Sequence, residues 1–119
     1  MDLEIIKYIE SNKFEEAFKL IVKEYKQKVY WQARRMVLIH EDADDVTQNV
    51  FIKVFQNLAT FKSESKFSTW IFRITYNETI NFINKNAKEK NVSFEEYSVS
   101  ISDNLTSDEY YDGDKIDQK

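Results

Sequence analysis

The sequence predicts an all-α protein, and two observations support this fold class. The 119-residue chain contains one Gly and no Pro, so it has few of the residues that mark tight turns between short strands. Apolar residues instead recur at the spacing of amphipathic helices along most of residues 2–88. We expect a helical bundle made of three long helices and a short helix at the N-terminus.

The first two helices are expected in residues 2–10 and in residues 13–38, separated by a polar break at Ser11-Asn12. The longer segment places apolar or small side chains at every third or fourth position, as one buried face of a helix requires. These positions are Phe14, Ala17, Phe18, Ile21, Val22, Tyr25, Val29, Ala33 and Met36.

The third helix is expected to have Asp42 as its N-cap residue and to end near Leu58 or Ala59. Carboxylates at the N-cap and in the first turn accept hydrogen bonds from free amides there and complement the helix dipole. The predicted apolar stripe of this helix consists of Val46, Val50, Val54, Phe55 and Leu58.

A fourth helix is expected after the polar segment TFKSESKFS and ends near Lys88. Its predicted core face consists of Phe67, Ile71, Ile74 and Phe82. From Asn91 onward no helical period continues, and the sequence is rich in Ser and Asp. We therefore expect one domain over residues 1–90, with its core at about 12–90, followed by an acidic flexible linker or tail over residues 91–119.

Charge is distributed unevenly along the chain, whose net charge is −4. Residues 1–59 carry 9 basic and 10 acidic side chains, residues 60–90 carry 6 and 3, and residues 91–119 carry 2 and 8. Affinity for phosphate follows the local field rather than the overall charge. The basic excess within residues 60–90 is therefore compatible with a nucleic-acid-binding surface.

Several classes of function find no support in the residue types. The absence of Cys excludes a disulfide framework and thiolate metal sites. His40 is the only histidine, and no phosphate loop or nucleophile elbow occurs. The acids Glu41, Asp42, Asp44 and Asp45 lack the spacing of a Ca²⁺ loop. We therefore expect no enzyme, no metal and no cofactor.

The N-terminus lacks the pattern of a signal peptide, and no segment approaches the ~20 apolar residues that span a bilayer. We therefore expect a cytoplasmic protein without membrane insertion.

The segment DADDVTQNVFIKVFQNLATFKSESKFSTWIFRITYNETINF contains an ordered set of anchor residues. They are Asp42-Ala43-Asp44-Asp45-Val46, Gln48, Val50-Phe51, Phe61, Phe67, Thr69-Trp70-Ile71-Phe72-Arg73-Ile74 and Asn77. Over roughly residues 12–90, their order and spacing resemble region 2 of the extracytoplasmic-function (ECF) branch of the sigma-70 family. The resemblance implies the helical region 2 fold. It also implies a role in binding core RNA polymerase and in recognising and melting the promoter −10 element during transcription initiation.

The resemblance implies that the third helix docks on the coiled-coil clamp helices of the polymerase β′ subunit. Asp45 and Gln48 match the docking helix of the family, and a separation of three residues places them on one helix face. The candidate polymerase-binding residues are Asp45, Gln48, Asn49, Lys53 and Gln56.

The resemblance also implies that the loop and the fourth helix hold the non-template strand of the −10 element. In the family this loop captures a base flipped out of that strand, and aromatic side chains beside a basic groove suit melted DNA. Asn77 matches a position that contacts the element, and its amide donates and accepts hydrogen bonds at once. The candidate DNA-binding residues are Lys62, Ser63, Glu64, Ser65, Lys66, Trp70, Arg73, Tyr76, Asn77, Asn81, Asn84, Lys85 and Lys88.

The sequence departs from the family pattern in three respects. Ser63 stands where family members often carry Gly in the loop. Asn49 stands where a Glu commonly follows the clamp-binding Gln. We expect the chain to lack the C-terminal helix-turn-helix domain of the family, which reads the −35 element. An anti-sigma factor, which commonly covers apolar surface on sigma domains, is a further candidate partner.

Two alternative functions stay open at this point. A helical protein-interaction module without DNA binding would keep its function in Asn77→Ala and Lys66→Ala variants. A regulator that occupies a nucleic-acid channel by mimicry would depend on the acidic residues 91–119. The sigma-factor interpretation predicts instead that the domain folds and binds polymerase without residues 91–119.

Overall fold

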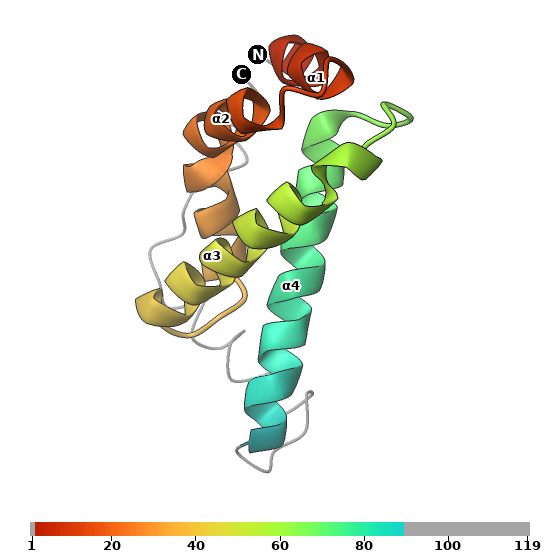
Figure 1. Cartoon of the computed structure of the whole chain (residues 1–119). Coiled ribbons are helices and arrows are strands. Elements are labelled where there is room, and N and C mark those ends of the chain that lie inside the picture. Colours follow the sequence, from red (N-terminus) through yellow and green to blue (C-terminus); the bar gives the residue numbers. More distant parts are fainter. Residues whose placement is uncertain (1, 90–119) are drawn as a thin grey trace.

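The computed structural model describes residues 2–89, which form four α-helices and one short 3₁₀ helix (Figure 1). The α-helices are α1 (Asp2–Glu10), α2 (Phe14–Arg34), α3 (His40–Asn57) and α4 (Phe67–Glu89), and the 3₁₀ helix η1 (Leu58–Thr60) extends the end of α3. No strand occurs among these described residues. The prediction of an all-α bundle with a short N-terminal helix is confirmed.

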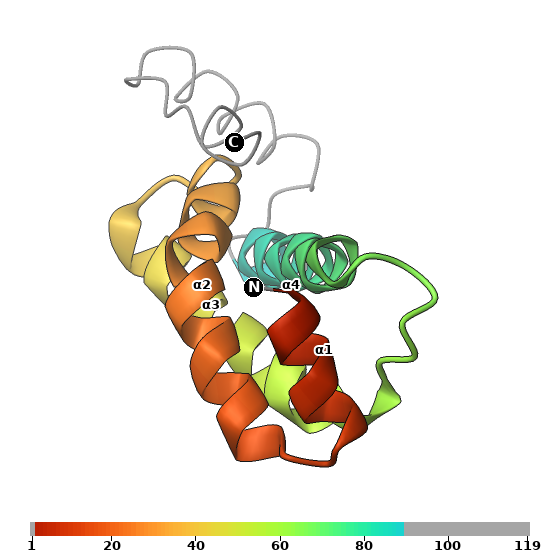
Figure 2. The ribbon, with the colours of Figure 1, turned by 90° about the horizontal axis from the view of Figure 1, so that it is seen from above.

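The three long helices surround one apolar core, and α1 covers the end of the bundle at which α2 begins (Figures 1 and 2). All four helices contribute fully buried side chains, as their amphipathic patterns require. The largest of these are Ile5, Ile21, Val29, Val46, Val50, Val54, Leu58, Phe67 and Ile71.

A buried tyrosine ties α1 to the rest of the bundle. Tyr25 of α2 is 4% exposed and donates its hydroxyl proton to the Asp2 carboxylate of α1, with O–O distances of 2.8 and 3.0 Å. Its ring meets Phe67 and Phe72 of α4 edge-on, with centroid distances of 5.6 and 5.8 Å. The tyrosine thus combines apolar burial with a satisfied hydroxyl group.

The predicted end of the second helix is wrong by about one turn, because α2 ends at Arg34. The amides of Met36 and Val37 both bond to the Ala33 carbonyl, at 2.9 and 3.1 Å, which tightens the last turn. Val37, which follows this turn, is buried in the core. The chain therefore turns toward α3 earlier than its apolar period suggests.

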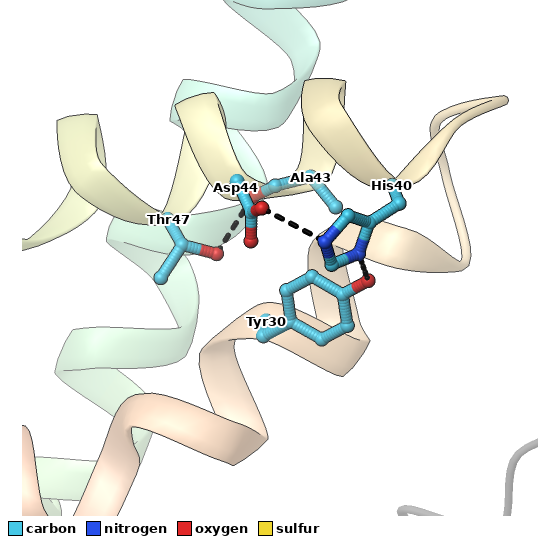
Figure 3. A network of polar contacts seen from close by, with 5 residues as sticks. All are labelled: Tyr30, His40, Ala43, Asp44 and Thr47. Carbon is cyan, nitrogen blue, oxygen red and sulfur yellow. Dashed lines mark hydrogen bonds and ion pairs between the residues drawn. The ribbon is translucent and has the colours of Figure 1, made fainter.

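The predicted N-cap of the third helix is also wrong, because α3 begins at His40 and Ile39 occupies the N-cap position. The His40 ring is held between two elements (Figure 3). Its Nδ1 atom lies 2.5 Å from the Tyr30 hydroxyl of α2, and its Nε2 atom lies 3.0 Å from the Asp44 carboxylate. These contacts hold the first turn of α3 against α2, and Asp42 falls within that turn.

The core face of α4 repeats every fourth residue and includes two threonines. The hydroxyl groups of Thr75 and Thr79 are fully buried and donate to the carbonyls of Ile71 and Thr75, at 2.9 and 2.7 Å. The predicted core residues Ile74 and Phe82 are half-buried and pack against the fully buried residues of the core. The buried face consists of Phe67, Ile71, Thr75, Thr79, Ile83 and Ala87.

None of the helices between residues 2 and 89 is long and apolar enough to cross a membrane. The linker or tail predicted over residues 91–119 lies outside the described residues.

Candidate protein and nucleic-acid interfaces

Two grooves of different chemistry flank α3, which runs between α2 and α4 in Figure 1. The first, called the apolar groove, has a volume of about 460 Å³ and lies between α2 and α3. Its lining residues are Phe18, Val22, Lys26, Thr47, Gln48, Phe51, Ile52, Phe55 and Gln56. The second, called the mixed groove, has a volume of about 240 Å³ and lies between α3 with η1 and α4. Its lining residues are Lys53, Asn57, Thr60, Trp70, Ile74, Asn77 and Glu78.

The apolar groove exposes large side chains that a core would normally bury. The rings of Phe51 and Phe55 meet Phe18 edge-on, with centroid distances of 6.3 and 5.1 Å. Ile52 and Phe55 are nevertheless 53% and 48% exposed. A contiguous exposed apolar surface rimmed by polar groups is typical of a protein-binding site.

The sequence pattern did not reveal this groove, for two reasons. The apolar period predicts that Phe55 belongs to the buried stripe of the third helix, and its exposure makes that prediction wrong. Ile52 lies on the polar face of α3 and belongs to none of the predicted core, polymerase-binding or DNA-binding residues. The sequence feature that could have indicated the apolar groove is this aliphatic residue on an otherwise polar helix face.

The five residues predicted to bind polymerase are all exposed on α3, and they border three different grooves. Gln48 and Gln56 line the apolar groove, whereas Lys53 lines the mixed groove. Asp45 and Asn49 line a third groove, called the acidic groove, toward the end of α4.

The mixed groove brings together two residues predicted to bind DNA. Trp70 and Asn77 of α4 share it with Lys53 and Asn57 of α3. Trp70 is half-buried, and its ring packs against Phe61 and Phe67 with centroid distances of 5.4 Å each. The aromatic wall of the groove is therefore held in place by the core, while polar groups form the opposite wall.

Two short hydrogen bonds fix the polar wall of the mixed groove. The Asn57 side-chain amide donates to the Lys53 carbonyl at 2.8 Å, and the Thr60 hydroxyl donates to the Asn57 carbonyl at 2.7 Å. The Thr60 oxygen, having given its proton to the backbone, is left as a hydrogen-bond acceptor.

The loop next to the mixed groove is exposed at all five of its predicted DNA-binding residues, Lys62, Ser63, Glu64, Ser65 and Lys66. Buried rings flank it on both sides, since Phe61 and Phe67 contact each other with a centroid distance of 5.4 Å. Ser63 has a φ of 61°, in the left-handed region that favours glycine. This conformation is a physical reason for the Gly that the family often carries there.

The other DNA-binding candidates on α4 are distributed over two surfaces. Asn81 and Lys85 line the acidic groove together with the carboxylates of Asp45, Glu78 and Glu89, which disfavour a phosphate there. A second set is exposed and lines none of these three grooves, namely Arg73, Tyr76, Asn84 and Lys88.

Comparison with known proteins identifies the family. A family model described as sigma-70 region 2 matches residues 21–89. The chain belongs to the sigma-70 region 2 family. The resemblance seen in the sequence motifs is thereby confirmed, and every residue of the mixed groove lies inside the matched segment.

Curated relatives of this sigma region 2 chain are named as ECF or related sigma factors. The chain is 41% identical over 71 residues to the ECF RNA polymerase sigma factor SigW of Bacillus subtilis (strain 168), which covers 60% of this chain and 38% of that protein. It is 38% identical over 69 residues to the ECF RNA polymerase sigma-E factor of Escherichia coli (strain K12), with coverage of 58% and 36%. It is 37% identical over 67 residues to the RNA polymerase sigma-H factor of Pseudomonas aeruginosa, with coverage of 56% and 35%.

The chain therefore spans little more than a third of the length of the curated relatives it matches. No solved structure matches it significantly.

Proposed function

We propose that this sigma region 2 domain binds core RNA polymerase and captures an unstacked base of the promoter −10 element from the non-template strand. One observation carries the proposal: Trp70 and Asn77 meet Lys53 in a single groove beside the exposed loop. Single-stranded DNA presents base faces, base edges and phosphates, and it is held by aromatic rings, amides and cations respectively. The proposed role is one of binding and positioning, in which no substrate is turned over.

The size of the mixed groove supports a single base as its occupant. Its volume of about 240 Å³ is below the roughly 300–1,000 Å³ of pockets for drug-sized ligands. One planar ring system is therefore a suitable occupant of the groove. Extruding such a base costs a few kcal/mol, which is lowest when the strand is already melted.

The exposed loop supports the proposal by adding two cations between η1 and α4. Lys62 and Lys66 are exposed on either side of Ser63. Because counterions are released when such cations meet phosphates, they would add affinity that does not depend on base identity. Base recognition is then left to the side chains inside the groove.

The apolar groove and the outer face of α3 are the proposed docking surface for the β′ clamp helices. Ile52 and Phe55 supply exposed apolar area, and Gln48 and Gln56 supply amides at its edge. An amphipathic helix that lays its apolar face into a groove is a common mode of recognition between proteins. Asp45 lies on the exposed side of α3, where its carboxylate suits a basic group on the partner.

The DNA part of the proposal is tested by titrating the chain with single-stranded and duplex DNA that contain a −10-type sequence, followed by NMR. We expect preferential binding of the non-template single strand, weakened about tenfold by Asn77→Ala. The matched control is Asn84→Ala, because Asn84 is an exposed asparagine on the same helix that lines none of the three described grooves. Equal losses in both variants, or no loss in Asn77→Ala, would contradict base capture in the mixed groove.

The polymerase part is tested by calorimetry with the purified β′ clamp helices. We expect binding in the micromolar range or tighter, lost in Asp45→Lys and weakened in Gln48→Ala. Glu16→Lys is the control, because it makes the same type of charge reversal at an exposed position on α2 outside the described grooves. Unchanged affinity in Asp45→Lys would rule out this docking surface.

One observation favours a second candidate, a helical protein-interaction module without DNA binding: the apolar groove has nearly twice the volume of the mixed groove. A regulatory partner such as an anti-sigma factor, if it covers the apolar groove, would compete with polymerase there. The candidates differ in the Asn77→Ala and Lys66→Ala variants, which only the sigma-factor role requires to be impaired.

A further inference from the structure

We propose that Glu78 makes the mixed groove selective for a base that carries an exocyclic amine, namely cytosine, adenine or guanine, over thymine. The inference rests on the proposed function, since it names the class of base that the groove would hold. It begins from the hydrogen-bonding groups that line the groove and from the position of the Glu78 carboxylate among them.

Acceptors are prominent among the groups with free capacity in the mixed groove. The Thr60 oxygen has donated its proton to the Asn57 carbonyl, and the Asn57 amide nitrogen has one N–H engaged with the Lys53 carbonyl. The Asn57 side-chain oxygen is left free to accept. Glu78 adds two carboxylate oxygens that only accept when ionised. Glu78 thus places a carboxylate that can only accept beside the donors of Asn77 and Lys53.

The position of Glu78 is costly for DNA binding unless the carboxylate has a specific partner. Its side chain is half-buried and borders both the mixed groove and the acidic groove. Among the described residues, no ion pair joins it to Lys53 or to Arg73. A carboxylate beside a bound strand repels the phosphates, so it lowers the affinity for every sequence equally. An amine on the captured base would offset that penalty for some bases only.

The edges of the four bases differ in the group that such a carboxylate would meet. Cytosine and adenine present an exocyclic amine, and acidic side chains accept from the cytosine amine in known readout patterns. Guanine also carries an exocyclic amine, beside its N1–H, and an unstacked guanine can donate both to a carboxylate, whereas thymine has carbonyl oxygens and no amine. Ring nitrogens beside the amine accept hydrogen bonds, which the Asn77 amide or the Lys53 ammonium can donate.

The test is an NMR titration of the full 119-residue chain with oligothymidylates in which only the central base varies. The bases are thymine, guanine, cytosine, adenine and two analogues that lack the exocyclic amine, namely 2-pyrimidinone and purine. We expect cytosine, adenine and guanine to bind about tenfold more tightly than thymine and the two amine-free analogues. In Glu78→Gln this ratio should fall close to one, because an amide can also donate to a carbonyl oxygen.

Glu16→Gln serves as the control, because it removes the same charge from an exposed position outside the grooves and should keep the tenfold ratio. A ratio near one in the unmodified chain, or a tenfold ratio that survives in Glu78→Gln, would overturn the inference. Those outcomes are distinct from failure of the proposed function, in which Asn77→Ala leaves the affinity for every oligonucleotide unchanged.

Discussion

The apolar groove and the mixed groove share α3 as a common wall, yet they differ in almost every chemical respect. Phe18, Ile52 and Phe55 expose apolar surface on one side of the helix, whereas Lys53 and Asn57 present polar groups on the other. With about 3.6 residues per turn, neighbours in the sequence point to different sides of a helix. Ile52 and Lys53 therefore belong to different surfaces although they are consecutive.

Consecutive residues of α3 thus belong to different candidate interfaces, so the groove that a residue lines, and not its position in the sequence, indicates which partner it would contact. If the apolar groove docks a protein and the mixed groove holds a base, substitutions in one should leave the other function intact. Substitutions in the core, in each groove and in the loop test that separation, with expected effects that decrease in this order.

Phe67→Ala is expected to lower the free energy of unfolding by about 3–5 kcal/mol. Phe67 is 1% exposed, and its ring contacts Tyr25, Phe61 and Trp70, so its loss leaves a cavity behind the mixed groove. Urea unfolding followed by circular dichroism measures the change. Phe14→Ala, at a half-buried position far from that ring cluster in the sequence, should cost less. Equal costs would show that the wall of the mixed groove has no special dependence on Phe67.

Phe55→Ser is expected to weaken binding to the β′ clamp helices by about 30-fold, the effect of a residue contributing about 2 kcal/mol. Because Phe55 is already 48% exposed, the unfolding free energy should change little, and single-stranded DNA affinity should not change. Calorimetry and the DNA titration measure the two affinities.

Leu3→Ser provides the comparison for Phe55→Ser, since Leu3 is 74% exposed on α1 and lines no described groove. It should leave clamp binding intact. A similar loss in both variants would mean that general surface apolarity, and not the apolar groove, drives the association.

Lys53→Ala is expected to weaken single-stranded DNA binding a few-fold and to lower the slope of log affinity against log salt by about 0.7. The reason is the position of Lys53 in the mixed groove, where its ammonium can neutralise one phosphate. Clamp affinity should be unchanged, with Lys19→Ala as a control at an exposed position on α2. If Lys53→Ala loses clamp binding and keeps its DNA affinity, Lys53 belongs to the polymerase-binding surface, as the sequence predicts.

The sequence was sufficient to predict the fold class, because helical periods and the near absence of Gly and Pro are properties of the chain alone. The sequence was insufficient to predict which residues form the buried face of α4. Thr75 and Thr79 read as polar in the sequence, but each hydroxyl is satisfied by a backbone carbonyl one turn earlier, which makes its burial inexpensive. Only the structure shows that bond.

Only part of the mixed groove could be predicted from the sequence, because Asn57, Thr60 and Glu78 belong to no predicted binding set. Trp70 and Asn77 come together with Lys53, whereas Asn81 and Lys85 lie with three carboxylates around the acidic groove. Helical spacing alone places residues on a face, but the crossing of α3 and α4 decides which faces meet. That crossing depends on side-chain packing between the helices.

The loop differs from both grooves in being held by backbone conformation, and Ser63→Gly tests this difference. At a φ of 61° a residue with a side chain is strained by roughly 1–2 kcal/mol, which Gly avoids. Gly also loses more chain entropy on folding, by about 0.5–1 kcal/mol. The net expectation is a stabilisation of about 0.5 kcal/mol, measured by urea unfolding, with an unchanged affinity for DNA if the backbone keeps its path.

Ser65→Gly is the control for Ser63→Gly, because φ is not positive at Ser65 and only the entropy term applies there. It should destabilise the domain by about 0.5–1 kcal/mol, opposite in sign to the change at Ser63. Two changes of the same sign would show that the loop does not hold Ser63 in the left-handed region. Backbone strain would then fail to explain why the family often carries a glycine at this position.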